Sequence, residues 1–269
     1  MKPVKRQWRG IAGFTIVELL TVISIIVILI GLLVPALNMV KRYAKKVSQK
    51  NQFHAIKIGL ETYNAEWDGY PPSRENGDFC GAMKLCEALV GLDRRGFKPG
   101  SKFEWTLDWA MYNADVDLSD RRPYLTPDNS NAYALGNVNG PANTGPYDPK
   151  VPVICDMYPR VTNQDTGRLI GMPVLYFKAD TTKTLNDYTK PEESIINYMD
   201  NMGLFGLKVA WDPGLTHVIT PAIFYEQILN KNLPSTVPVR PYNADSYILM
   251  SAGFDGLYGT DDDVFNFGM

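Results

Sequence analysis

The chain has 269 residues, of which 45% are hydrophobic and 21% charged, a composition typical of folded proteins and unlike that of disordered chains or multi-span membrane proteins. Its 27 basic and 29 acidic residues give a net charge of −2, so no overall basic field favours nucleic acid as a partner. The length allows one large core or two small ones.

Three cysteines, Cys80, Cys86 and Cys155, form neither a C-x-x-C pair nor a metal-ligand spacing, which argues against a zinc site. If the domain is exported, Cys80 and Cys86 could close a short disulfide loop, and Cys155 would be a small buried apolar residue. The alternative is three reduced, partly buried thiols. The sequence leaves both arrangements open.

An apolar segment near the N-terminus, FTIVELLTVISIIVILIGLLVPAL at residues 14–37, contains a single charged residue, Glu18. As a helix it would be roughly 36 Å long, enough to cross a bilayer core. A secretory signal peptide is the alternative, but the run is longer than its usual apolar region and no A-x-A-like site follows. Basic residues flank the segment on both sides, so charge alone does not orient it.

A short basic leader ends in Gly13, and Phe14 and Glu18 follow as the first and fifth residues of the remaining chain. This arrangement resembles the class III signal of type IV pilins and type II secretion pseudopilins. The resemblance implies that residues 1–13 are a leader, cut by a prepilin peptidase between Gly13 and Phe14, and that the new amine of Phe14 is N-methylated. It also implies a single-pass inner (cytoplasmic) membrane protein with a cytoplasmic N-terminus and a periplasmic or extracellular globular domain.

The carboxylate of Glu18 is unusual within this apolar run. An acid surrounded by hydrocarbon is costly unless it has a partner, so we expect Glu18 to have one. By resemblance, Glu18 meets the amine of Phe14 in a neighbouring subunit during filament assembly, and Pro35 matches a proline at which pilin helices bend or melt. The alternative is that Glu18 snorkels to the interface or stays protonated.

Beyond Pro35, apolar residues recur at steps of three and four, which predicts an amphipathic helix over residues 38–67 that continues the transmembrane half at 14–37. Asp68-Gly69 and the following prolines predict its end. The whole helix would be roughly 80 Å long, which suits a filament subunit. The stretch at 61–73 resembles the end of the long helix in pseudopilins, and residues 83–92 predict a short second helix.

Residues 68–269 are predicted to form the globular domain. The expected fold class is α+β and, by resemblance, pilin-like, with the long helix packed on a small antiparallel sheet and insertions at about 93–170 and 180–244. The first insertion is rich in Asn, Gly and Pro, which favours turns over regular structure. Strands are predicted at 151–158, 172–179 and 246–253, and helices at 191–201, starting after Thr189, and at 221–230.

An acidic, glycine-rich stretch, SAGFDGLYGTDDDVFNF, closes the chain. Clustered carboxylates suit calcium, although the spacing is not that of an EF-hand. The stretch resembles the C-terminal loop of the major pseudopilin, which implies a structural Ca²⁺ with Asp255, Asp261 and Asp263 as side-chain ligands. Ser251 is an additional candidate, and Asp262 falls at a position that need not be acidic. The alternative is a D-G turn followed by a solvated acidic run.

An enzyme is not expected. The two histidines, His54 and His217, stand near no nucleophile elbow or metal-binding spacing, and no phosphate-binding glycine motif occurs. The expected function is a structural subunit of a type II secretion pseudopilus, which assembles with other copies of itself and other pseudopilins into a periplasmic filament for protein export. The first alternative is a type IV pilus (minor) pilin acting in adhesion or motility, and the second is a membrane-anchored hydrolase.

Overall fold

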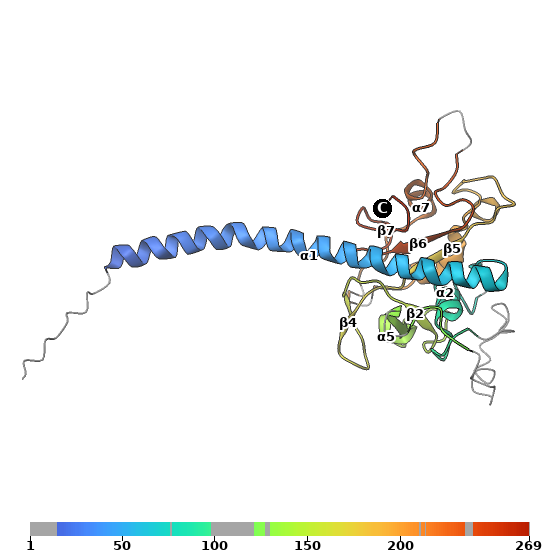
Figure 1. Ribbon diagram of the computed structural model, residues 1–269, viewed down its shortest axis with the longest axis horizontal. Coiled ribbons are helices and arrows are strands. Elements are labelled where there is room, and N and C mark those ends of the chain that lie inside the picture. Colours follow the sequence, from blue (N-terminus) through green and yellow to red (C-terminus); the bar gives the residue numbers. More distant parts are fainter. Residues whose placement is uncertain are drawn as a thin grey trace, which may run out of the picture. The chain divides into compact units, whose positions relative to one another are not determined.

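The computed structural model describes residues 15–75, 77–97, 121–126, 130–209, 211–212, 214–234 and 239–268. The fold is α+β, with a long N-terminal helix, several short helices and three small antiparallel sheets (Figure 1). The chain divides into two compact units between Ala44 and Lys45, inside the long helix.

Helix α1 spans Ile16–Trp67 and continues through Pro35 without interruption. Its side chains up to Ala44 are exposed, and the helix is long and apolar enough to cross a membrane. The helix ends where Asp68 takes a left-handed conformation, with φ of 54°, ahead of Gly69. The predicted helix and its predicted end are therefore confirmed over the described residues.

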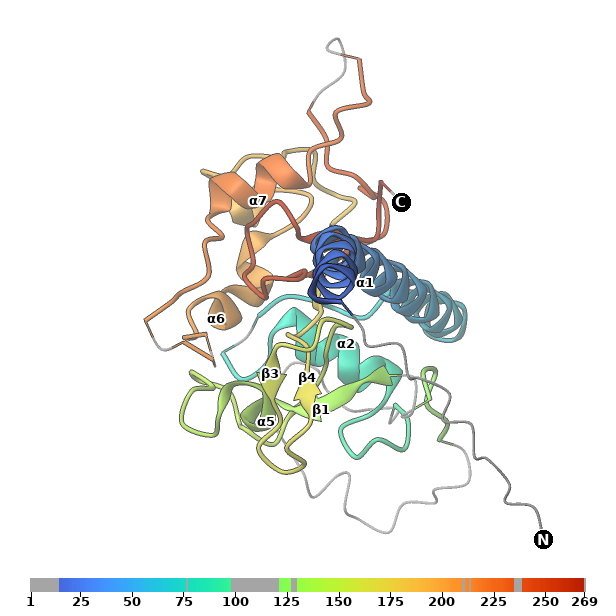
Figure 2. The same ribbon diagram turned by 90° about the vertical axis from the view of Figure 1, so that its left-hand side faces the viewer.

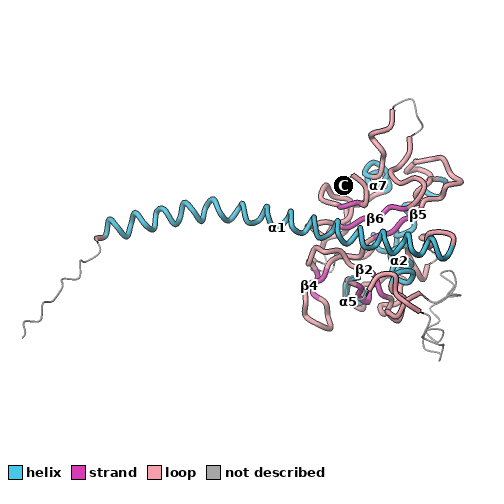
Figure 3. Tube along the Cα trace, in the orientation of Figure 1, coloured by secondary structure: helices cyan, strands magenta, loops and turns pink. Residues whose placement is uncertain are grey.

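The other elements belong to the globular unit, in which loops make up most of the described chain (Figure 3). They are α2 (Gly81–Leu89), β1 (Ala132–Ala134), α5 (Leu135–Asn139), β2 (Pro152–Ile154), β3 (Val161–Thr162), β4 (Leu169–Ile170), β5 (Leu175–Lys178), η2 (Pro191–Glu193), η3 (Tyr198–Asn201), α6 (Met202–Phe205), α7 (Pro221–Gln227), β6 (Tyr247–Ser251) and β7 (Val264–Phe265).

The strands form three separate antiparallel sheets, β1–β2, β3–β4 and β5–β6–β7. In the largest sheet Tyr176 lies opposite Leu249, and Ser251 lies opposite Val264. Figures 1 and 2 place α7 and the C-terminal strands on one side of α2, and α5 with β1–β4 on the other. The three predicted strands are confirmed as β2, β5 and β6, each shorter than predicted.

The C-terminal part of α1 packs on the β5–β6–β7 sheet. Phe53, Ile56 and Leu60 are buried in one cluster with Tyr176 of β5 and Leu249 of β6. The buried face of the helix therefore corresponds to the amphipathic stripe that the sequence predicts.

Two glutamines occupy the polar gap in this stripe. Gln49 and Gln52 are both buried, and the amide of Gln52 donates to the Cys155 carbonyl at 2.8 Å. The side-chain oxygen of Gln49 accepts from the Met157 backbone N–H at 2.7 Å. These side chains extend the interface of α1 to the chain that follows β2, by hydrogen bonds instead of apolar contact.

Helix α2 is buried along its whole length, nearer the N-terminus than predicted, at 81–89 instead of 83–92. The position that a Cβ would take at Gly81 is occupied by the backbone carbonyl of Tyr176, so this helix starts directly against β5. Glycine allows that close approach.

The predicted helix at 191–201 is wrong. This segment forms two short 3₁₀ turns, η2 and η3, separated by buried Ser194, Ile195 and Ile196. Ser194 has an extended backbone, with φ of −83° and ψ of 153°, and the Ile195 N–H donates to the Leu185 carbonyl at 2.9 Å, so no continuous helix forms. Thr189 starts no helix, because its hydroxyl donates to Asp187 at 2.8 Å.

The predicted helix at 221–230 is confirmed in its first part as α7. Thr220 caps it by accepting from the Ile223 N–H at 3.3 Å, and Pro221 occupies the first turn. The first insertion is more regular than predicted, because it contains β1 and α5. Its residues 98–120 and 127–129 lie outside the described chain.

The three cysteines are free thiols, and all three are fully buried. Cys80 directly precedes α2 and Cys86 lies within it, and the two belong to different core clusters, so they form no disulfide. Burial raises the pKa of Cys80 to about 12. The alternative of three reduced thiols is therefore confirmed.

The stripe of α1 offers a matched pair of substitutions. Ile56→Ala removes a side chain with no exposed surface and should lower the free energy of unfolding by about 2–5 kcal/mol. Ile58→Ala, at a position 55% exposed two residues away, should change it by less than about 0.5 kcal/mol. Urea unfolding of the purified full chain in mild detergent measures both, and equal losses would contradict the packing described.

Candidate functional sites

The first turn of α1 is closed by Thr15 and Glu18. The backbone N–H and the hydroxyl of Thr15 donate to Oε2 of Glu18 at 2.9 and 2.7 Å, and the Glu18 N–H donates to the Thr15 hydroxyl at 3.2 Å. This reciprocal pattern is a capping box, which satisfies N–H groups that the helix leaves unpaired. Glu18 thus has a partner within its own helix. Gly13 and Phe14, the predicted cleavage and methylation residues, lie outside the described chain.

The loop between β6 and β7 brings three of the four clustered carboxylates together. Oδ2 of Asp262 accepts from the N–H groups of Phe254 and Asp255 at 2.6 and 3.0 Å. Oδ2 of Asp263 accepts from the Gly259 N–H at 2.8 Å. Asp262, which the resemblance treats as replaceable, therefore organises the loop, whereas Asp261 is exposed.

Glycines allow the loop to close this tightly. Gly253 has φ of 66°, and a Cβ there would collide with the backbone carbonyl of Asp262. A side chain at Gly253 would both strain the backbone and open the loop.

Gln227 of α7 belongs to the same site, although no sequence motif points to it. Its Nε2 donates to the Thr260 carbonyl and to Oδ2 of Asp263, each at 3.0 Å. The amide oxygen of Gln227, Oε1, and the second carboxylate oxygen of Asp263, Oδ1, are both buried. Neither atom has a hydrogen-bond partner in the described chain. Two buried acceptors without a donor are costly.

Two carboxyl groups of the β6–β7 loop also have raised pKa values. Burial, with the nearby charges of Asp262 and Asp255, raises the pKa of Asp263 to about 8, and burial also raises the pKa of Asp255. A cation would stabilise the ionised forms of both. In the part of the chain that the structure describes, no group of three or more His, Cys, Asp or Glu side chains is arranged to hold a metal ion. Calcium here would therefore need backbone or amide oxygens as well as carboxylates, which calcium accepts.

Ser251, the additional candidate, is directed toward a different carboxylate. Its hydroxyl donates to Oδ2 of Asp156 at 2.7 Å and accepts from the Gly253 N–H at 3.3 Å. Oδ1 of Asp156 accepts from the N–H groups of Tyr158 and Met172, both at 3.1 Å. Burial raises the pKa of Asp156 to about 7. Ser251 therefore connects the end of β6 to the segment after β2.

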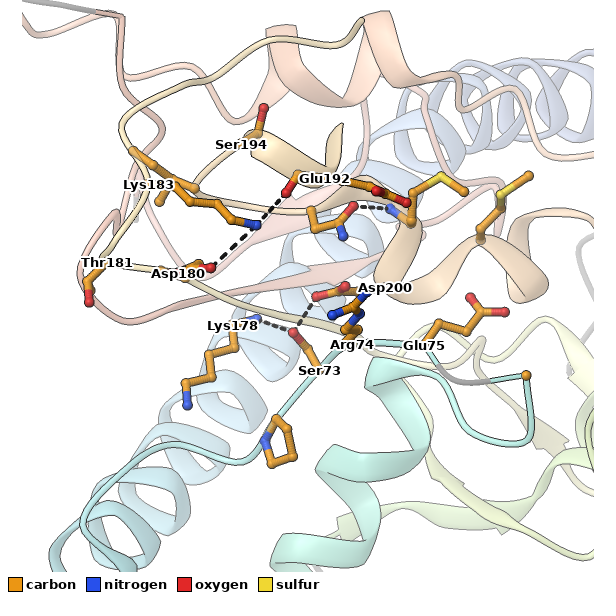
Figure 4. A pocket seen from close by; sticks show the side chains of 17 residues that line it. Ser73, Arg74, Glu75, Lys178, Asp180, Thr181, Lys183, Glu192, Ser194 and Asp200 are labelled. Atoms are coloured by element: carbon orange, nitrogen blue, oxygen red, sulfur yellow. Dashed lines mark hydrogen bonds and ion pairs between the residues drawn. The ribbon is translucent and has the colours of Figure 1, made fainter. Parts of the chain in front are cut away.

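An open, polar pocket of about 710 Å³ lies where the chain after α1 meets the loops after β5 and around η3 (Figure 4). At its base the Ser73 hydroxyl donates to Asp200 and accepts from the Lys178 N–H at 2.8 Å. Near its rim Lys183 pairs with Asp180 at 3.4 Å. Ser73, Asp200 and Asp180 are thus engaged with other groups of the protein, and burial raises the pKa of Asp200 to about 7.

The two histidines have no catalytic arrangement around them in the described residues. His54 is exposed on α1. Nδ1 of His217 accepts from the Tyr258 N–H at 3.3 Å, and burial lowers the pKa of His217 to about 4. His217 is thus a neutral, structural side chain.

No protein-family model, curated protein or solved structure matches the chain.

The buried carboxyls predict how stability depends on pH. The pKa values of Asp156, Asp200 and Asp263 are raised from 3.8 to about 7, 7 and 8, so the folded state keeps protons that the unfolded chain has released. Without divalent cations, the stability that these carboxyls contribute should therefore be complete below about pH 4 and be lost as the pH rises from there to about 7 to 8, by at most about 1.4 kcal/mol per pH unit for each carboxyl.

Urea unfolding of the full chain between pH 5 and 8, with a chelator present, measures this slope. Asp156→Asn keeps the size of the side chain and removes its charge, so its slope should be shallower than that of the wild type. Asp78→Asn, at an exposed acid, serves as control and should keep the wild-type slope. Identical slopes for Asp156→Asn and the wild type would contradict the prediction.

Proposed function

We propose that the chain is a structural subunit of a type II secretion pseudopilus, processed by a prepilin peptidase and assembled with other copies of itself and other pseudopilins. One observation carries the proposal. The leader ending in Gly13, followed by Phe14, precedes a capping box at Glu18 that starts a 52-residue helix. The apolar part of that helix is exposed and its amphipathic part is packed on a sheet, as a filament subunit requires.

The capping box suggests how Glu18 acts in assembly. Oε2 of Glu18 holds both hydrogen bonds from Thr15, and a carboxylate has a second oxygen. Glu18 can therefore keep its own helix start closed while it receives the positively charged amine of Phe14 from a neighbouring copy. In hydrocarbon that pairing removes the cost of two isolated charges, and so it sets the position of each incoming subunit.

We propose that α1 anchors the chain in the inner membrane, with the leader in the cytoplasm and the globular unit in the periplasm or outside the cell. The exposed apolar side chains up to Val40 support a span. Pro35 stays in a regular helix in this form. A proline inside a helix lacks one hydrogen bond, so α1 is weakest there if it bends or melts on assembly.

We also propose that the β6–β7 loop binds a structural Ca²⁺, which would supply the positive charge that its carboxylates lack. Asp255 and Asp263 fit as side-chain ligands, and the unpaired Oδ1 of Asp263 is the strongest support. Asp261 fits less well because it is exposed, and Asp262 takes the inner position. Gln227 would hold Asp263 in place from α7.

A type IV pilus (minor) pilin would share the N-terminal signal. The open pocket at Ser73 and Asp200 favours this alternative over a purely structural subunit, because an adhesive pilin needs a surface that accepts a ligand. Incorporation into surface pili together with ligand binding by the globular unit would support it.

Assembly in cells tests the main proposal. The wild-type chain should yield a mature N-terminus at methylated Phe14 by mass spectrometry and form filaments together with its secretion machinery. Glu18→Ala should be cut and inserted normally but should form no filaments, since the amine of the neighbouring Phe14 then has no partner. Ser24→Ala, whose hydroxyl bonds only the carbonyl of Leu20 in its own helix, is a matched control within the same span and should assemble normally.

An intact Met1 would remove the basis of the proposal. Normal filaments from Glu18→Ala would leave the processing intact but refute the role of Glu18.

Calcium binding is tested separately by thermal unfolding of the purified full chain in detergent. Calcium at about 100 times its dissociation constant should stabilise the fold by about 2.7 kcal/mol, and a chelator should reverse the effect. Asp255→Asn should abolish the shift in midpoint. Asp262→Asn should weaken it more than Asp261→Asn, because Asp262 holds the loop closed. An unchanged wild-type midpoint would contradict the calcium site and leave the filament proposal untouched.

A further inference from the structure

Charge is strongly segregated along the chain. Residues 40–60 contain six basic residues and no acidic one, and they follow the apolar run directly. Residues 61–269 contain 28 acidic and 17 basic residues, a net charge of −11. We name the first four cations, Lys41, Arg42, Lys45 and Lys46, the basic collar.

The basic collar lies at a defined depth along α1. The apolar stretch of the helix from Ile16 to Val40 is 25 residues long, or about 37 Å, slightly more than the hydrocarbon core of a bilayer. The collar therefore begins at the level of the lipid headgroups. Tyr43, 72% exposed, lies within it, at the depth where aromatic side chains favour the interface.

We propose that the basic collar binds anionic phospholipid headgroups in the leaflet on the side of the globular unit; this inference rests on the proposed membrane anchoring. Lys41, Arg42 and Lys46 are exposed, and long cationic side chains can extend from a helix to phosphate groups. Clustered basic residues beside a span attract anionic lipids, with about a fivefold gain in affinity for each cation. The acidic globular unit is repelled by the same surface.

A second copy of the chain is the other partner with complementary charge. Its densest group of acids is the β6–β7 loop, but that loop uses its carboxylates internally. Asp262 accepts two backbone N–H groups, and Asp263 accepts from Gly259 and Gln227. Only Asp261 of the clustered acids is exposed. Lipid phosphates carry no such internal bonds, and the collar stands at their depth, so the lipid surface is favoured.

Native mass spectrometry of the full chain tests the proposal. The protein, extracted in detergent, is incubated with equal amounts of phosphatidylglycerol and phosphatidylcholine, and the retained lipids are counted. The wild type should retain phosphatidylglycerol preferentially, less so at high salt, since screening weakens charge interactions at the surface. Replacing all four collar residues with glutamine should reduce this preference at least about tenfold.

A matched control replaces the same number of exposed cations on the globular unit, with Lys150→Gln, Arg168→Gln, Lys208→Gln and Lys231→Gln, and should keep the wild-type preference. An equal loss in both variants, or no preference in the wild type, would overturn the proposal. So would an unchanged preference in the collar variant combined with loss of cross-linking between copies, which would assign the collar to a second copy.

Flotation with vesicles of phosphatidylcholine alone separates this result from the proposed anchoring. A wild-type chain that floats but shows no preference for phosphatidylglycerol refutes the collar proposal only. A chain that does not float refutes the anchoring itself.

Discussion

The contact between the C-terminal part of α1 and the central strand β6 determines the arrangement of the globular unit. All five residues of β6 are buried, and they alternate between two clusters. Tyr247 and Leu249 face the cluster that contains Ile56 and Leu60 of α1, whereas Met250 faces the opposite cluster. Because strand side chains alternate, one strand serves both layers. The long helix thereby fixes the strand from which the C-terminal loop starts.

Three buried carboxyl groups also form hydrogen bonds between segments that are distant in the sequence. Asp156, after β2, receives the hydroxyl of Ser251 at the end of β6. Asp200 of η3 receives the hydroxyl of Ser73, which follows α1, and Asp263 receives the amide of Gln227 from α7. Loops rich in turns bury little apolar surface, so a few buried hydrogen bonds to carboxyls have a large share in holding them. The same groups make the fold sensitive to protons and cations.

The sequence predicts those features that depend on local periodicity. The 3.6-residue repeat and the Asp68-Gly69 stop predict the extent of α1, and the β-rich runs predict the centres of β2, β5 and β6. Prediction fails where tertiary contacts dominate. The Ile195 N–H donates to the Leu185 carbonyl instead of to a helical one, and the predicted helix at 191–201 is replaced by two turns. A one-dimensional pattern cannot show such a bond between segments.

The residues of the candidate sites likewise divide into those that the sequence indicates and those that it does not. Glu18 stands out in the sequence because it is the single charge in an apolar run, and its partner Thr15 is three residues away. Asp156 and Gln227 have no comparable signal, since each reaches its partner across a long stretch of chain. Even within the acidic loop, the resemblance favours Asp261 over Asp262, but the N–H groups of Phe254 and Asp255 donate to Asp262.

The division of α1 into an exposed apolar part and a packed amphipathic part has a physical consequence for any assembly. The side chains of the first part are exposed, and apolar surface of this extent is typical of a segment that contacts lipid or another apolar partner. Transfer from lipid to a bundle of helices exchanges one apolar environment for another and gains little from the hydrophobic effect. If the chain assembles as we propose, polar groups decide when a subunit leaves the membrane: Glu18 at one end of the apolar run would favour the neighbouring subunit, and the basic collar at the other end would favour the lipid.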